Sequence, residues 1–411
     1  MDTINALEDS GWLKTDHDWL SMHPVLREYI QSWPWQDEEN YLASAEAFMG
    51  RLYELIKPEG KGNDSVKQFP EDYTRLWHLL RLAEQMVVNL GIMTPASQRL
   101  SYHLVMDAPV DQDEWMLRRC LALLRHPDHL DPDSVLRLYN EAAILFRRFN
   151  YFDDALDTLK EMKAYLIRHP GAYYWSVYHN TTGNILHDMD AEKNLRRCMK
   201  QQDEAIAAAK LSRHPGAQKL LATCLMDKAM TLIDLGTDLK ACGRLLDDAA
   251  DIIRKISADY DYERYHWLCI AAMYHVKATG DPEKALHCLE EATRIADTSR
   301  DSAMAYADHL LDQCAPIYYE MGRVDKAVEV IREAIRLCEE NMEIATYRRL
   351  RFEAYLFLAQ IYTNTGDYIK AETIYDLLEP CRSDSPYVFD ESKPLCPQSI
   401  RDKAAEQRKQ N

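Results

Sequence analysis

Two stretches near the C-terminus repeat the same order of small, aromatic and apolar positions. One reads "APIYYEMGRVDKAVEVIREAI" (315–335) and the other "AQIYTNTGDYIKAETIYDLLE" (359–379). In each, an alanine is followed at identical spacings by a tyrosine, a glycine, a second alanine and a bulky apolar residue. Apolar positions with helical spacing on both sides of the glycine predict two helices joined by a tight turn. Such a hairpin buries its apolar face only by stacking on a neighbour.

The second alanine marks the start of the second helix of each hairpin and recurs along the chain. The anchors are Ala155, Leu195, Ala241, Ala285, Ala327 and Ala371, at intervals of 40, 46, 44, 42 and 44 residues. The residues predicted to close the first helices in a left-handed turn are Asn150, Asp190, Gly236, Gly280, Gly322 and Gly366. This pattern resembles the tetratricopeptide repeat, with units longer than the usual ~34 residues. The resemblance implies an all-α fold, a right-handed α-α superhelix of about six helix pairs over 131–379.

A second marker recurs with a similar period. "LRHPD" (124–128), "IRHPG" (167–171) and "SRHPG" (212–216) each place a proline where a helix is expected to stop. The arginine and histidine then fall in the last turn, where positive charge is favourable to the helix dipole. We interpret these histidines as helix-terminal residues, not as metal ligands or catalytic groups.

Composition narrows the functional class. Hydrophobic residues make up 47% of the 411 positions, and the formal net charge is −18. That charge disfavours a nucleic-acid partner, because phosphates would be repelled. Ten cysteines occur singly without a CxxC pair, which predicts buried thiols. We find no signal peptide and no apolar run long enough for a membrane span, so we expect a cytoplasmic protein without a membrane partner.

The N-terminal third follows a different pattern. Gly11-Trp12-Leu13 is followed by a polar turn and by Met22-His23-Pro24-Val25-Leu26-Arg27-Glu28. This text resembles the end of the winged-helix domain in STAND-class P-loop NTPases, where it precedes a helical-repeat sensor. The resemblance implies a winged-helix remnant at 1–35, an irregular helical linker or cap at 36–130, and a sensor solenoid at 131–379. Residues 380–411 are expected to form a tail, and its charged end "RDKAAEQRKQN" (401–411) is expected to be a frayed helix or disordered.

The chain contains none of the motifs that we associate with catalysis. GxxxxGK[ST], HExxH, GxSxG and the kinase set are absent from the sequence. The NTPase implied by the resemblance is therefore not in this chain. We expect no enzymatic activity, no cofactor and no metal.

The first helix of each pair is expected to line the concave face of the solenoid. Asn180 and Asn184 lie one turn apart there and suit hydrogen bonding to an extended peptide backbone, whereas Arg147 and Arg148 suit a carboxylate or a phosphate. The predicted ligand- or partner-binding residues are Asn140, Arg147, Arg148, Asn180, Asn184, His187, Met226, Met230, Asp234, Tyr274, Lys277, Asp312, Tyr319, Gln360 and Asn364.

The leading hypothesis is a non-catalytic, ligand- or protein-sensing solenoid, the C-terminal sensor of a STAND signal-transduction ATPase with a regulatory or anti-phage role. Its expected partners are a peptide or protein in the concave groove and the NTPase domain of the same parent protein. The alternatives are a free-standing receptor for a peptide signal and a scaffold for protein assembly.

Overall fold

The computed structural model describes residues 13–16, 19–22, 81, 95–106, 108, 112–127, 129–256, 261–298, 302–340, 342, 345–384 and 394–410. Most of the expected winged-helix remnant (1–35) and much of the expected helical linker (36–130) lie outside the described residues. Within the N-terminal part, β1 (Leu13–Asp16) pairs with β2 (Trp19–Met22) as an antiparallel hairpin, with Leu13 opposite Met22 and Asp16 opposite Trp19. The sequence analysis expected a polar turn here and did not predict the flanking strands.

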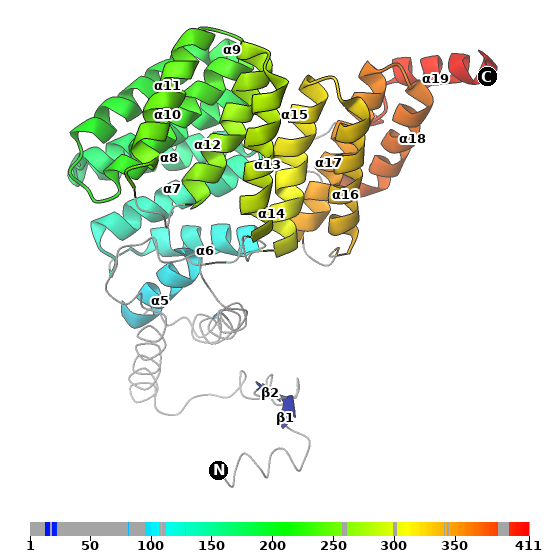
Figure 1. Ribbon diagram of the computed structural model, residues 1–411. Coiled ribbons are helices and arrows are strands. Elements are labelled where there is room, and N and C mark those ends of the chain that lie inside the picture. The colour runs from blue at the N-terminus through cyan, green and yellow to red at the C-terminus, as the bar shows by residue number, and fades with distance from the viewer. Residues whose placement is uncertain are drawn as a thin grey trace.

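The remaining described elements are helical and follow one another as antiparallel pairs in chain order (Figure 1). Six pairs occupy the predicted solenoid, and they form a right-handed α-α superhelix of the tetratricopeptide type. The elements are α7 (Pro132–Arg148) with α8 (Phe152–Arg168), the two halves of α9 (Ala172–Leu211), α10 (Ala217–Asp234) with α11 (Leu239–Ile253), α12 (Asp261–Tyr274) and η3 (His275–Thr279) with α13 (Pro282–Thr298), α14 (Ser302–His309), η4 (Leu310–Cys314) and α15 (Ala315–Glu320) with α16 (Val324–Glu339), and α17 (Ala345–Asn364) with α18 (Tyr368–Leu378).

Most turns inside the pairs have the predicted left-handed backbone. Gly236, Gly280, Gly322 and Gly366 have φ values between 59° and 80°, and Asn150 has φ 58°. The prediction for Asp190 was wrong, because this residue is extended (φ −175°, ψ 94°) and bends α9 without a loop. Its carboxylate accepts a hydrogen bond from the backbone N–H of Lys193 at 3.0 Å and thereby caps the second half of the helix.

One predicted anchor is displaced by a residue. Ala155, Ala285, Ala327 and Ala371 are fully buried, each four residues after its N-cap. In the third pair the turn from Gly236 to the N-cap Asp238 is one residue longer than in the other pairs with a glycine. Cys242, not Ala241, therefore takes the anchor position and is 0% exposed.

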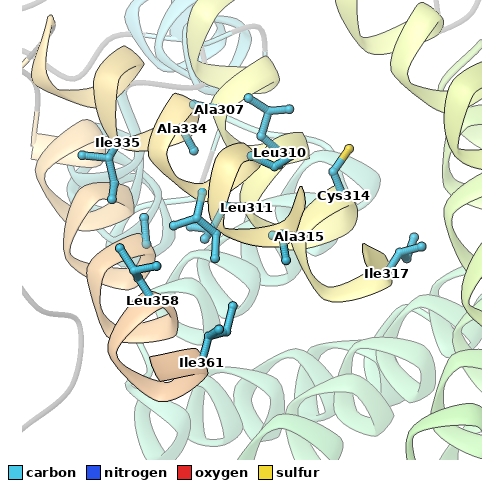
Figure 2. Close-up of a cluster of buried hydrophobic side chains, with 14 of the residues drawn as sticks. Ala307, Leu310, Leu311, Cys314, Ala315, Ile317, Ala334, Ile335, Leu358 and Ile361 are labelled. Carbon is cyan, nitrogen blue, oxygen red and sulfur yellow. The ribbon is translucent and has the colours of Figure 1, made fainter. Parts of the chain in front are cut away.

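The core alternates small and branched side chains between successive helices. Around α14, α16 and α17, Ala307, Ala315 and Ala334 lie among larger residues (Figure 2). Alanine lets two helices approach closely, and the neighbouring leucine and isoleucine side chains fill the space beside it. The large residues of this cluster that Figure 2 labels are Leu310, Leu311, Ile317, Ile335, Leu358 and Ile361.

Helices outside the six pairs cover both ends of the array. On the N-terminal side, α5 (Pro95–Met106) and α6 (Asp113–Arg125) lie within the segment predicted to be helical and share a buried cluster with α7. On the C-terminal side, the turn η5 (Glu379–Asp384) leads to α19 (Gln398–Gln410), which packs against α18.

The expectation of a frayed or disordered tail was therefore wrong. Ile400 and Ala404 of α19 are buried, and Arg401 bonds to Asp376 at 2.8 Å. Gln407 accepts from the backbone N–H of Ile369 and donates to the carbonyl of Gly366. Sequence reasoning weighted the charge of this segment and missed its two apolar positions, one helical turn apart.

Two of the three Arg-His-Pro motifs end helices as predicted. α6 and α8 end at Arg125 and Arg168, and the following histidine is the C-cap. The third motif differs, because α9 already ends at Leu211 and His214 instead stacks on Tyr173, with ring centroids 3.9 Å apart. Within the part of the chain that the structure describes, no helix is both long and apolar enough to cross a bilayer.

Candidate functional site: the concave face of the first helices

Side chains on the first helices of adjacent pairs bond to one another along one face of the array, here called the concave face. The hydroxyl of Thr181 on α9 donates to Asn140 Oδ1 on α7 at 2.6 Å. Further along, Asn364 on α17 donates to the hydroxyl of Tyr319 on α15 at 3.0 Å, and Lys277 lies 3.6 Å from Glu320. These contacts join helices about 41 to 45 residues apart in sequence. Four of the residues predicted from helical spacing, Asn140, Lys277, Tyr319 and Asn364, thus take part in contacts between successive first helices.

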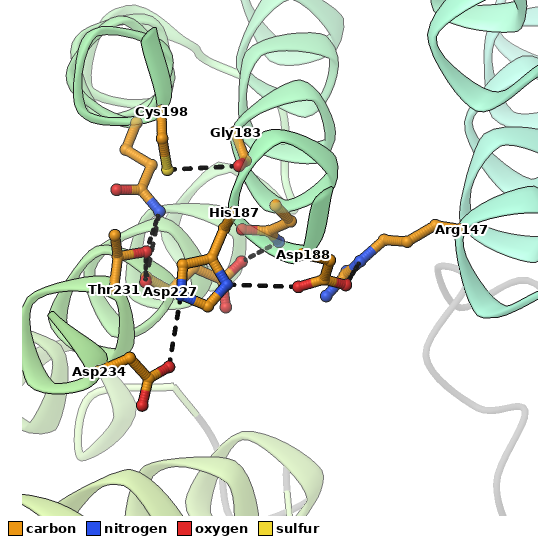
Figure 3. Close-up of polar contacts among 10 residues, drawn as sticks. Arg147, Gly183, His187, Asp188, Cys198, Asp227, Thr231 and Asp234 are labelled. Atoms are coloured by element: carbon orange, nitrogen blue, oxygen red, sulfur yellow. Dashed lines mark hydrogen bonds and ion pairs between the residues drawn. The ribbon is translucent and has the colours of Figure 1, made fainter. Parts of the chain in front are cut away.

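Asn180 and Asn184 converge on Asp227 of α10. Both side-chain amides donate to the same carboxylate atom, Asp227 Oδ2, at 2.8 and 2.7 Å. The two asparagines therefore share a face, as predicted, but their donors are already engaged within the protein. The backbone carbonyl of Asp227 also accepts from Thr231 and from the buried Gln202 (Figure 3). Asp227 is the centre of this cluster, and the sequence analysis did not single it out.

One turn further along α9, His187 lies between two carboxylates. Its Nδ1 is 3.3 Å from Asp188, and its Nε2 is 3.3 Å from Asp234 on α10 (Figure 3). Hydrogen bonds to Asp188 and Asp234 raise the pKa of His187 to about 9 against the cost of partial burial, so the ring is charged at neutral pH. Asp188 also bonds to Arg147 of α7 at 2.6 Å. The charged chain from Arg147 to Asp234 ties three successive first helices together.

A second group of charged residues lies where the superhelix turns back toward its start. Arg148 bonds to Asp113 of α6 at 3.1 Å and also influences the pKa of Asp308 on α14, nearly 200 residues further along than Asp113. In Figure 1 one end of α6 is drawn beside α14, in agreement with this long-range influence.

Several carboxyl groups near Arg148 and Arg349 have raised pKa values, which means that their charged forms are disfavoured. Burial and the charges of Asp308 and Glu353 raise the pKa of Asp312 well above its usual range, and Arg349 only partly opposes them. Burial also raises the pKa values of Asp308, Glu353 and Glu141, despite the compensating charges of Arg349 for the first two and Arg148 for the third. The side chains of Asp308 and Asp312 are nevertheless exposed to solvent.

Tyr262, on α12, connects the two groups. It is 55% exposed, yet burial of its hydroxyl and the charge of Asp227 raise its pKa, with further contributions from Glu263 and Asp308 and opposition from Arg148. The pKa of Tyr262 thus responds to charges of both groups. Sequence reasoning missed it because it is the second residue of its helix, before the first projected groove position.

Three predicted groove residues have their side chains elsewhere. Met226 is fully buried and belongs to the core, so its side chain is not available to a ligand. Met230 is half-buried against the same core cluster, and the hydroxyl of Tyr274 lies against Gly243 on α11. Helical spacing alone placed these residues, and it does not show which side of the helix packs on the following one. Gln360 is exposed on α17.

The buried thiols do not form a reactive site. All ten cysteines are free, and every one except Cys381 is buried. Cys314 Sγ lies 3.2 Å from His309 Nε2, but His309 is 1% exposed and burial raises the pKa of the Cys314 thiol to about 11. A thiol in that state is a poor nucleophile. Among the described residues, no three His, Cys, Asp or Glu side chains are grouped so that they could hold a metal ion.

A separate open depression of about 1040 Å³ lies outside the concave face, along α16 and α18. Its charged side chains are paired within their own helices, for example Lys326 with Glu329 and Lys370 with Asp367, both at 2.7 Å. Arg332 donates to the hydroxyl of Tyr362 at 3.1 Å. Because its charges are balanced and solvated, we do not place the functional site there.

Comparison with known proteins agrees with the repeat architecture. A family model described as the tetratricopeptide repeat matches residues 315–341 and 352–378, so these segments are tetratricopeptide repeats. They coincide with the two stretches from which the pattern was first read. A second model, described as anaphase-promoting complex subunit 5, matches residues 250–313. No curated protein matches the sequence.

Several solved helical-repeat structures are similar to the chain. A Rap protein complexed with competence and sporulation factor has 15% identity and a TM-score of 0.48, over 89% of this chain and all of its own. The apo form of the quorum sensor NprR from B. thuringiensis has 12% identity and a TM-score of 0.35, over 84% and 100%. A STAND protein with a tetratricopeptide repeat sensor from Pyrococcus horikoshii has 14% identity and a TM-score of 0.33, over 98% of this chain and 60% of its own. None of these similarities is strong enough to transfer a ligand or an activity to this chain.

Proposed function

We propose that this chain is a non-catalytic sensor that binds an extended peptide, or an extended segment of a protein, along its concave face. The observation that carries the proposal is the cluster of Asn180, Asn184 and Asp227, because it brings amide and carboxylate groups of two adjacent first helices to one point. Amides and carboxylates at that spacing suit the alternating N–H and C=O groups of a peptide main chain.

The row of interhelical bonds would couple such binding to the shape of the array. A ligand that bonds to Asn184 or Asp227 replaces contacts that now join α9 to α10. Because each pair contacts mainly its neighbours, a change of angle at one junction rotates all later pairs with it. A solenoid can therefore report ligand binding at one end of the array to a domain attached at the other.

We further propose that the parent protein is a STAND signal-transduction ATPase in which this chain is the C-terminal sensor. Support comes from the sequence between Gly11 and Glu28, which resembles the end of a winged-helix domain. The β-hairpin of Leu13–Asp16 and Trp19–Met22 lies within that text. Sequencing the reading frame upstream of Met1 tests this part, since a P-loop and a winged helix are expected there. A reading frame that starts at Met1 would contradict it and leave the free-standing receptor or the scaffold.

The binding proposal is tested with a pool of random hexapeptides offered to the full chain, with bound peptides quantified by mass spectrometry. We expect retention by the wild type and a loss of tenfold or more in the Asn180→Ala/Asn184→Ala double variant. Asn194→Ala is the matched control, because Asn194 lies in the second half of α9 and pairs with Arg197 of the same helix. Equal retention by all three proteins would remove the groove assignment.

A further inference from the structure

We propose that the concave face selects peptides that carry a lysine or arginine side chain, and that the ammonium or guanidinium group binds at Asp227. This inference rests on the proposed function and names the chemistry of its ligand. It follows from atoms in the asparagine cluster that lack donors and from the balance of charge around the groove.

The first observation is an open carboxylate oxygen. Both asparagine amides donate to Asp227 Oδ2, and Asp227 Oδ1 accepts no hydrogen bond from the residues that the structure describes. This oxygen is also not fully enclosed by protein. An accessible carboxylate oxygen that is fixed in position by its neighbours is a preformed acceptor for a charged donor.

The second observation is an enclosed acceptor beside it. Asn180 is 7% exposed, and its Oδ1 has no hydrogen-bond partner although its Nδ2 donates to Asp227 at 2.8 Å. An unpaired buried carbonyl is costly, on the order of 1–3 kcal/mol. Both groups that lack a donor at this point are acceptors, and Asp227 Oδ1 is the one that solvent reaches. Lysine brings three N–H donors and arginine five, with no acceptor, so either side chain can donate to that exposed oxygen.

The third observation is negative charge, formally −18 for the whole chain. On the facing wall, Asp308 is exposed, and Arg148 and Arg349 oppose its charge. The raised pKa values of Asp308, Asp312, Glu353 and Glu141 reduce the charge that these carboxyls carry, so the wall adds only in part to the excess of the chain. A groove lined by one sign of charge concentrates ligands of the opposite sign. The same charge excludes an anionic peptide or a nucleic acid.

The test compares two hexapeptide pools that are random at five positions. One pool has lysine fixed at the remaining position and the other has norleucine, which matches the lysine stem without its charge. On the full chain in 50 mM salt, we expect the lysine pool to bind at least tenfold more tightly. The preference should fall steeply with added salt.

Variants locate the preference. Asp227→Asn should bring the two pools to within about twofold of each other, whereas Asp157→Asn, on the exposed face of α8, should leave the preference intact. Should Asp227→Asn disturb folding, Asp308→Asn tests the facing wall at a solvent-exposed site and should reduce the preference at least threefold.

The outcomes separate the two proposals. Equal binding of both pools by the wild type overturns the cationic preference but leaves peptide binding in place. A lysine preference that survives both Asp227→Asn and Asp308→Asn overturns the assignment of the site. If neither pool binds, the proposed function itself fails and this inference fails with it.

Discussion

Replacing His309 with glutamine should flatten the acid sensitivity of folding. His309 is 1% exposed, with Nδ1 2.8 Å from the hydroxyl of Tyr265 and Nε2 3.0 Å from that of Thr293. No carboxylate is bonded to the ring among these contacts, and burial lowers its pKa from 6.5 to about 4. The folded protein therefore holds this imidazole neutral in a region where the unfolded chain already binds a proton.

The sign and size follow from linkage. A histidine with a lowered folded pKa costs nothing above pH 6.5, and stability is lost as the pH falls from 6.5 toward 4. At 1.36 kcal/mol per pKa unit, the full loss is about 3 kcal/mol, and roughly 2 kcal/mol of it is reached at pH 5. Carboxyl groups with raised pKa values, such as Asp312, increase the stability of the folded state as the pH falls over part of this range. The comparison is therefore made between the wild type and the variant.

The assay is urea unfolding followed by circular dichroism at pH 7.5 and pH 5.0. Glutamine has no titrating ring, so the variant is less stable at pH 7.5 through lost packing, by about 1–2 kcal/mol. The gap between the two proteins should then close by about 2 kcal/mol at pH 5.0. A gap that stays constant within about 0.5 kcal/mol would refute the reasoning, because it would mean that His309 titrates alike in both states.

The remaining predictions concern other charged groups and one turn. His187→Gln should show the opposite pH dependence. The folded pKa of His187 is raised to about 9, so the wild type gains stability from this ring below pH 6.5 and loses it as the pH rises to 9. Unfolding of both proteins at pH 6 and pH 9 checks this, and an unchanged difference in stability contradicts it. Asp312→Asn should raise the melting temperature by a few degrees, because burial and then the charges of Asp308 and Glu353 disfavour its ionised form; a lowered melting temperature would show that the carboxylate is satisfied. Gly322→Ala should cost about 1 kcal/mol because φ is 72°, a backbone conformation that alanine disfavours. No atom lies within 4 Å of an added Cβ, so the cost reflects the backbone alone. Gly171→Ala, at negative φ, serves as the control in the same thermal melt.

The repeat architecture could be predicted because its determinants are local. Gly322 and Gly366 are turn residues with a fixed backbone requirement, and Ala327 and Ala371 follow them at constant spacing. The turn between Gly236 and Asp238 is one residue longer, so the anchor position moves to Cys242. Comparing the spacing of alanines in the repeats could not detect this shift. An alanine and a cysteine have similar volumes, so the core tolerates either at the contact.

The site was harder to predict, because it depends on pairing between helices. Asn180 and Asn184 were identified from their spacing on one helix, but their partner Asp227 is more than 40 residues away. Arg148 on α7 influences Asp308 on α14 only because the array curves, and that curvature accumulates from small rotations at every pair. Met226 shows the converse error, since a rotation of a fraction of a helical turn moves a side chain from the groove into the core.

The bend at Asp190 gives the second pair a property that the others lack. Elsewhere, a left-handed residue and a short turn separate the two helices, so an error in one dihedral angle can be absorbed by its neighbours. In α9 the chain passes from one helix to the next through a single extended residue. Contacts between the two halves fix the angle of this bend: Cys198 Sγ donates to the carbonyl of Gly183, and the Ser176 hydroxyl donates to the carbonyl of Ala205. The second pair is therefore one continuous rod with an elbow, whose orientation is passed directly to every pair that follows it.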